Sequence, residues 1–73
     1  MGNLKDIIRE QRLNRNLTQA ELSRIMGYES PSTISMWESG DRTPDIKDLN
    51  KLADYFGVTC DYLLGRDTST NTA

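Results

Sequence analysis

Apolar residues recur along this chain at spacings of three and four, and the apolar groups are separated by glycine, proline and short polar residues. No segment sustains the strict alternation that is typical of a half-buried strand, so the pattern predicts helices throughout. With the capping residues included, the expected helices cover residues 3–14, 18–27, 30–40, 43–57 and 59–65. The expected fold class is therefore all-α, a compact five-helix bundle.

Signals at the helix ends support these ranges. Asn3 can cap the first helix, and Thr18 stands three residues before Glu21, which is the spacing of a capping box. Ser30 is the expected cap of the third helix, with Pro31 at the first helical position, where a missing N–H costs nothing. Four helices should end at a glycine, namely Gly27, Gly40, Gly57 and Gly65.

A chain of 73 residues forms one domain at most and buries only about 60% of its unfolded surface, so its core is small. Residues 1–66 are the expected domain, and the small polar residues 67–73 are the expected disordered tail. The helical spacing predicts that the following residues face inward: Leu4, Ile7, Ile8, Leu22, Ile25, Met26, Ile34, Trp37, Ile46, Leu49, Leu52, Ala53, Phe56, Leu63 and Leu64.

The third helix has an unusual outer face. If Ile34 and Trp37 point inward, Ser32 and Met36 point most directly outward, with Ser35 and Ser39 beside them. A short link joins this helix to the one before it, which is the arrangement that places a second helix in a DNA major groove. Hydroxyls can meet either type of base edge, and a methionine can contact a thymine methyl. A merely solvated serine face is the alternative.

Composition excludes several classes of function. Histidine is absent and Cys60 is the one cysteine, so an ordinary general base, a Cys–His pair and an imidazole metal ligand are all missing. No glycine-rich phosphate loop, metal-spaced cysteine set or long apolar run occurs. We therefore expect no enzyme, no metal or small-molecule cofactor and no membrane span, and the lone cysteine favours a cytoplasmic location.

Four segments in order carry a family resemblance: "LTQAEL" from residue 17, "STISMWESG" from residue 32, "TPDIKDLNKLADYFGV" from residue 43 and "DYLLG" from residue 61. Together they resemble the lambda repressor and Cro type of helix-turn-helix proteins over residues 4–65. The resemblance implies a transcriptional regulator of phage or bacterial type, expected to be a repressor, that binds a pseudo-palindromic double-stranded operator as a homodimer. An antitoxin or a protein-interaction module could use the same bundle.

The resemblance also implies roles for individual residues. Gln19 and Ser39 match phosphate-contacting positions, and Arg12 and Glu38 match an ion pair between the first and third helices. The base-contacting set comprises Ser30, Pro31, Ser32, Thr33, Ser35 and Met36. This chain departs from the family in having one residue more between Gly27 and Ile34, which lengthens the turn at Tyr28 and Glu29. It also has Pro31 where the family often has a long polar residue, and Asp41 where the family frequently has lysine.

Other expectations come from position. Thr18 is expected to contact phosphate, because it opens the second helix, where free N–H groups suit phosphate oxygens. Arg42 follows the third helix, where it can also reach phosphate. The apolar residues near the end of the chain exceed the need of one small core, which favours a dimer interface at Val58, Tyr62 and Leu63.

The net charge of −2 opposes DNA binding, because phosphate attraction supplies much of the affinity. The charge is unevenly distributed, however. Residues 1–28 contain five basic and three acidic side chains, whereas residues 43–73 contain three basic and five acidic ones. We therefore expect a modest monomer affinity, dependence on dimer formation and a small salt dependence.

Overall fold

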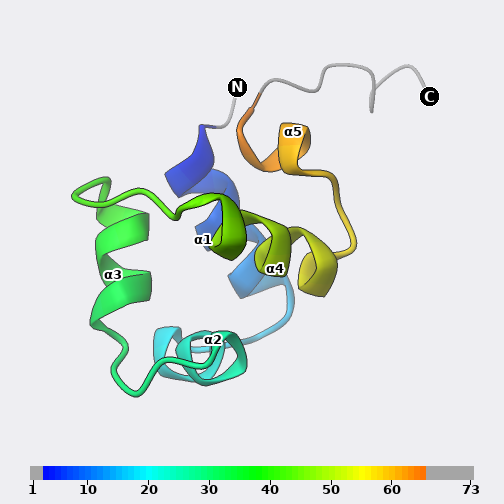
Figure 1. Cartoon of the computed structure of the whole chain (residues 1–73). Helices are drawn as coiled ribbons and strands as arrows, with labels where there is room; N and C mark the ends of the chain where they lie inside the picture. The colour runs from blue at the N-terminus through cyan, green and yellow to red at the C-terminus, as the bar shows by residue number, and fades with distance from the viewer. Residues whose placement is uncertain (1–2, 66–73) are drawn as a thin grey trace.

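The computed structural model describes residues 3–65, and within them the chain forms five α-helices and no strand (Figure 1). The expected tail, residues 67–73, lies outside the described residues. The expected all-α class is confirmed. The helices are α1 (Leu4–Asn14), α2 (Gln19–Met26), α3 (Ser32–Ser39), α4 (Ile46–Phe56) and α5 (Cys60–Leu63).

Most helix starts have the expected cap. The Asn3 side chain accepts from the Asp6 N–H at 3.3 Å, and Thr18 and Glu21 form the complete capping box. The prediction for α3 was wrong in detail: the helix begins at Ser32, and Pro31 is its cap, with no side-chain hydrogen bond. Pro31 already has near-helical angles (φ −73°, ψ −4°), and the Ser30 hydroxyl accepts from the Ser32 N–H at 3.1 Å. The contact expected of a cap at Ser30 is therefore present, although the regular helix begins at Ser32.

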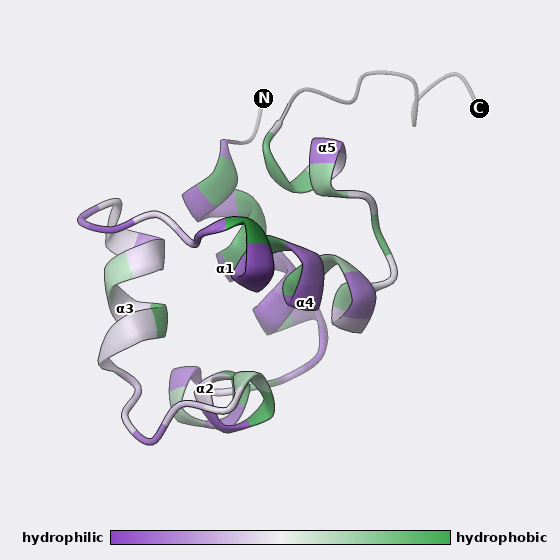
Figure 2. Cartoon of the chain, in the orientation of Figure 1, coloured by the Kyte–Doolittle hydropathy of each residue, from purple (hydrophilic) through white to green (hydrophobic). Residues whose placement is uncertain are grey.

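The apolar residues of all five helices form one core. Figure 2 shows how apolar (green) and polar (purple) residues are interspersed along the helices. Helix α1 packs against α3 and α5, α2 packs against α3 and α4, and α4 packs against α5. Burial of each large apolar side chain contributes about 1.5–3 kcal/mol. The buried apolar residues are Ile7, Ile8, Leu22, Met26, Ile34, Trp37, Leu49, Leu52, Ala53, Phe56 and Leu63.

Two residues expected in the core are exposed instead. Ile46 is 74% exposed and Ile25 is 44% exposed. Ile46 lies roughly 70° around the α4 axis from the centre of the buried arc, and Ile25 lies roughly 100° from the centre of the buried arc of α2. The place of Ile25 is taken by Ser23, which is buried beside the turn that leads into α3.

None of the helices in the described part of the chain combines the length and the apolarity needed to cross a bilayer.

Candidate nucleic-acid interface

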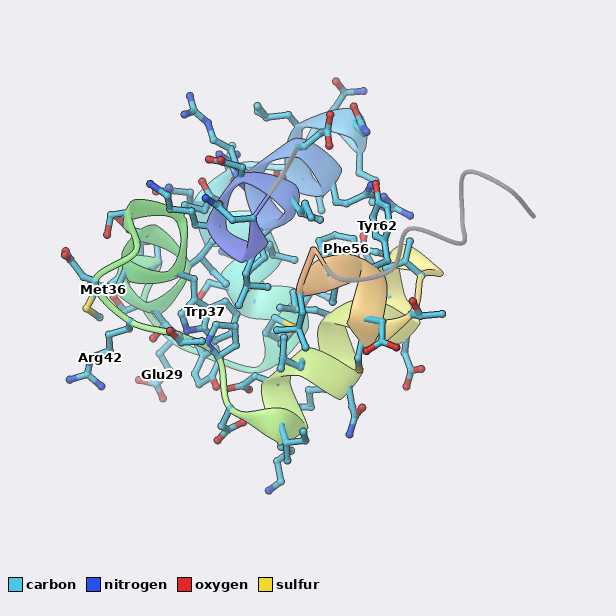
Figure 3. All side chains as sticks on the ribbon, turned by 90° about the horizontal axis from the view of Figure 1, so that it is seen from above. Glu29, Met36, Trp37, Arg42, Phe56 and Tyr62 are labelled. Carbon is cyan, nitrogen blue, oxygen red and sulfur yellow. The ribbon has the colours of Figure 1, made fainter. Side chains whose placement is uncertain are left out.

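Helix α3 is held from its inner side and leaves its outer side open. Ile34 and Trp37 are 0% and 3% exposed. Figure 3 shows Trp37 pointing inward, while Met36 and Arg42 point away from the bundle. The expected orientation of α3 is therefore confirmed. Its outer side carries the exposed residues Ser32, Ser35 and Ser39, with the half-buried Thr33 and Met36.

Several of these hydroxyls already have partners within the chain. The Ser30 hydroxyl donates to the Ser32 hydroxyl at 2.9 Å, at the start of α3. At its end, the Ser39 hydroxyl donates to the Met36 carbonyl and accepts from the Asp41 N–H. Because a hydroxyl can still accept a further bond, these contacts orient the serines without occupying them fully.

The three helices of this region meet at Glu38. Arg12 of α1 donates to both carboxylate oxygens of Glu38, through Nε at 2.7 Å and Nη2 at 3.0 Å, and its Nη1 donates to the Leu17 carbonyl at 2.7 Å. Gln19 of α2 donates to the same carboxylate at 3.1 Å. The structure thus contains the expected Arg12–Glu38 ion pair. Gln19 lies at this junction, and its phosphate contact stays a prediction.

A cleft of about 260 Å³ opens at the same junction. Arg12 is neutralised there by Glu38, whereas Arg9 has no carboxylate partner among the described residues. The cleft therefore offers one uncompensated positive charge beside the outer side of α3. Its lining residues are Arg9, Arg12, Gln19, Ser35, Glu38 and Ser39.

The start of α2 borders this region. The capping box occupies the backbone N–H groups of Thr18 and Glu21 at 2.8 and 3.0 Å. The N–H groups of Gln19 and Ala20 are in the first turn, where no intrahelical acceptor exists. An anion can therefore be bound at Gln19 and Ala20, but not at the Thr18 amide.

A second cleft, of about 420 Å³, lies at the C-terminal end of α3, where Trp37 and Ser39 line it. Lys5 of α1 and Arg42 both line it, together with the turn at Gly40. The turn is tight, since Gly40 has φ +90° and a Cβ there would lie 3.3 Å from the Lys5 Cδ. The two clefts place cationic side chains beside the serine-bearing helix and at its C-terminal end.

The lengthened turn between α2 and α3 is attached to its surroundings at several points. The Tyr28 hydroxyl donates to Asp48 Oδ1 of α4 at 2.6 Å, and the Tyr28 ring meets Trp37 edge to face at 6.0 Å. The hydrogen bond to Asp48, with burial and the nearby carboxylates adding to it, raises the pKa of Tyr28 from 10.0 to about 12. The buried Ser23 hydroxyl donates to the Ser30 carbonyl.

The residues expected at a dimer interface do not share one environment. Val58 and Tyr62 are half-buried. Leu63 is 0% exposed because α5 turns it into the core against α1 and α4, so its expected role at an interface was wrong. Tyr62 lies on the side of the molecule opposite Met36 and Arg42 (Figure 3).

The helix-turn-helix family profile matches residues 8–63 of this sequence, which include all of α2, the turn and α3. The chain belongs to the helix-turn-helix family. This match confirms the resemblance first read from the four sequence segments.

Individual relatives agree with the family assignment. The chain is 38% identical over 68 residues to the HTH-type transcriptional regulator AnsR of Bacillus subtilis, covering 93% of this chain and 58% of AnsR. It is 39% identical over 57 residues to the HTH-type transcriptional activator BcrR of Enterococcus faecalis, covering 78% of this chain and 28% of BcrR. The chain therefore spans little more than half of one curated relative and a smaller part of the other. Neither name is that of an enzyme.

A solved structure shares the fold. The P22 c2 repressor, crystallised in complex with a synthetic operator, superimposes with a TM-score of 0.81 at 30% identity, over 92% of this chain and 100% of the repressor chain. The expected lambda repressor-like fold is thereby confirmed.

Sequence reasoning missed three residues of this helix-turn-helix domain. Lys5 and Arg9 line the two clefts beside α3, and their spacing with Arg12 along α1 places all three on one side of that helix. That periodicity was visible in the sequence. The contact of Tyr28 was not, because its partner lies twenty residues further along the chain.

Proposed function

We propose that this chain is the DNA-binding part of a transcriptional regulator and that α3 enters the major groove of a duplex operator. The observation that carries the proposal is the outer side of α3, which bears small hydroxyls and Met36 and is flanked by two clefts with cationic side chains. Small side chains allow the helix backbone to approach base edges closely, and the flanking cations suit phosphates.

Within this proposal the side chains have distinct tasks. Met36 and Ser35 read bases. The residues at the start of the helix lie near the bases or near the DNA backbone, namely Ser30, Pro31, Ser32 and Thr33. Arg42, Ser39 and Gln19 contact phosphate, joined by Lys5 and Arg9. Phosphate contacts set affinity for any duplex, whereas base contacts set the preference for one sequence.

We further propose that the regulator binds as a homodimer that reads two half-sites about 34–36 Å apart. Val58 and Tyr62 are the residues we assign to the interface. The mode of regulation that we propose is occlusion of a promoter, in the cytoplasm, where bacterial DNA lies. The relatives include both an activator and a repressor, so the sign of regulation needs its own measurement.

Selection of bound sequences from a random duplex pool tests the proposal. We expect a pseudo-palindrome to emerge. Arg42→Ala should weaken binding to all duplexes and reduce the slope of log affinity against log salt concentration by about one, which corresponds to one phosphate contact. Met36→Ala should change the preference at one base position and leave this slope unchanged. The matched control is Arg24→Ala, which removes an exposed arginine that lines neither cleft beside α3. Failure of the folded protein to retain any duplex at low salt refutes the proposal.

Salt dependence and assembly are tested on the selected duplex. The slope should correspond to fewer than about ten phosphates per monomer, because the chain is acidic overall. Sedimentation should show two protomers on one duplex, and Tyr62→Ser should favour one protomer. Two protomers bound by Tyr62→Ser with unchanged cooperativity would rule out this interface.

A further inference from the structure

The turn between α2 and α3 is fixed to a third helix, and this attachment is the basis of the inference. Tyr28 reaches from the turn to α4, where its hydroxyl donates to Asp48 at 2.6 Å. The same residue keeps its N–H bonded to the Ser23 carbonyl at 2.9 Å. Its ring packs at 84° to the indole of Trp37, which is the inner anchor of α3. One side chain thus touches α3 and α4 while its backbone is bonded to α2.

A second contact fixes the end of the turn. The Ser23 hydroxyl, on a residue only 1% exposed, donates to the Ser30 carbonyl just before α3 begins. Together with Tyr28, this bond holds both halves of the turn. A turn lengthened by one residue would otherwise gain conformational freedom, and these two contacts remove that freedom in the folded state.

We infer that Tyr28 and Asp48 are positioning residues for α3, and that their hydrogen bond sets the angle at which this helix meets a duplex. The inference rests on the proposed function, since it concerns how α3 is presented to DNA. Asp48 is itself held in place, because its N–H is bonded to the Asp45 cap at 2.9 Å in the first turn of α4. Tyr28 therefore positions α3 relative to the first turn of α4, which is itself held in place.

Geometry indicates which property this hydrogen bond controls. Helix α3 has eight residues and is about 12 Å long. A tilt of about 10° about one end displaces the other end by about 2 Å, which exceeds the tolerance of a hydrogen bond. Base contacts by short serines would be lost, whereas long arginine and lysine side chains can follow a phosphate. Loss of the Tyr28–Asp48 bond should therefore reduce discrimination between duplexes more than it reduces affinity for duplex in general.

The test compares Tyr28→Phe, Asp48→Ala and Asp48→Asn. Each variant is titrated with the duplex selected for the wild type and with an unrelated duplex of the same length. The measured ratio is the affinity for the selected duplex divided by the affinity for the unrelated duplex. We expect this ratio to fall about tenfold in Tyr28→Phe and Asp48→Ala, a change that corresponds to the free energy of one charge-assisted hydrogen bond. Asp48→Asn keeps an acceptor oxygen and should retain most of the ratio. The control Tyr55→Phe removes the hydroxyl of an exposed tyrosine on α4, the helix that also carries Asp48, and should leave the ratio unchanged.

An unchanged ratio in both Tyr28→Phe and Asp48→Ala overturns the inference. Equal weakening on both duplexes also overturns it, because that result indicates a general loss of folded protein. If the affinity ratio falls as far in Asp48→Asn as in Asp48→Ala, the hydrogen bond is not the cause of the discrimination, and the inference is overturned.

A measurement without DNA separates this inference from the proposed function. Amide hydrogen exchange of residues 28–33 should accelerate in Tyr28→Phe, while exchange in α1 stays unchanged. Unaltered exchange in the turn overturns the inference even if the protein binds DNA. Retention of no duplex by the wild type refutes the proposed function instead.

Discussion

Arg12→Ala should be one of the most destabilising changes to a charged residue in this domain. The guanidinium makes three hydrogen bonds, two of them to Glu38 and one to the Leu17 carbonyl. The side chains of Arg12 and Glu38 are only 10% and 6% exposed. Removal of the arginine leaves a nearly buried carboxylate with Gln19 as its remaining side-chain donor.

The magnitude follows from that environment. Removal of one partner of a buried ion pair costs about 3–5 kcal/mol, because the other charge stays buried without compensation. Gln19 remains bonded and the adjacent cleft admits water, so we expect a loss near 3 kcal/mol. For a domain of this size, 1 kcal/mol corresponds to about 4–8 °C, and the expected drop in Tm is roughly 12–24 °C. The whole domain is expected to have only about 4–11 kcal/mol of stability.

Thermal unfolding followed by circular dichroism at neutral pH measures this drop. Arg9→Ala is the matched control, since it removes an exposed arginine one turn earlier on the same helix and should change stability by less than about 0.5 kcal/mol. The double variant Arg12→Met with Glu38→Leu should recover much of the loss, because no charge is then left buried. A Tm of Arg12→Ala within about 3 °C of the control would refute the reasoning.

Three further predictions concern single residues. Between pH 10 and 12 the wild type should lose stability that Tyr28→Phe does not lose, because folding raises the pKa of Tyr28 from 10.0 to about 12. Urea titrations measure this loss, which solvent screening of the half-buried phenol limits to about 1 kcal/mol. Leu52→Ala should cost about 2–5 kcal/mol and Ile46→Ser less than about 0.5 kcal/mol, since these residues are 0% and 74% exposed; equal losses would contradict the assigned core. Gly40→Ala should cost about 1–3 kcal/mol by thermal unfolding, because alanine is strained at φ +90° and its Cβ would crowd Lys5; an unchanged Tm would show that the turn relaxes.

Local signals account for the parts of the fold that the sequence predicted well. Capping residues act over three positions, so Asn3 and the Thr18–Glu21 box located two helix starts. Helical periodicity then assigned Ile34 and Trp37 to the inner side of α3. Both kinds of signal depend on neighbours along the chain.

The errors arose where the outcome depends on neighbours in space. Ile46 follows the apolar spacing of α4 but lies at the edge of the packed arc, and only the positions of the other helices decide its exposure. Helical spacing predicted that Leu63 faces inward, which the structure confirms, but Leu63 was also assigned to an interface. That assignment rested on the number of apolar residues near the end of the chain, and a number does not show which of them the core leaves exposed. The Tyr28–Asp48 bond joins two elements whose proximity follows from the complete bundle.

The division of α3 into an inner and an outer side has a consequence for how such a domain changes over evolutionary time. Ile34 and Trp37 provide its attachment to the core, while the outward serines are exposed and Met36 is half-buried. Under the proposed function, mutations that alter which promoter is bound can therefore accumulate without threatening the integrity of the protein. A library randomised at the outward positions should yield mostly folded members, from which new DNA preferences can be selected directly.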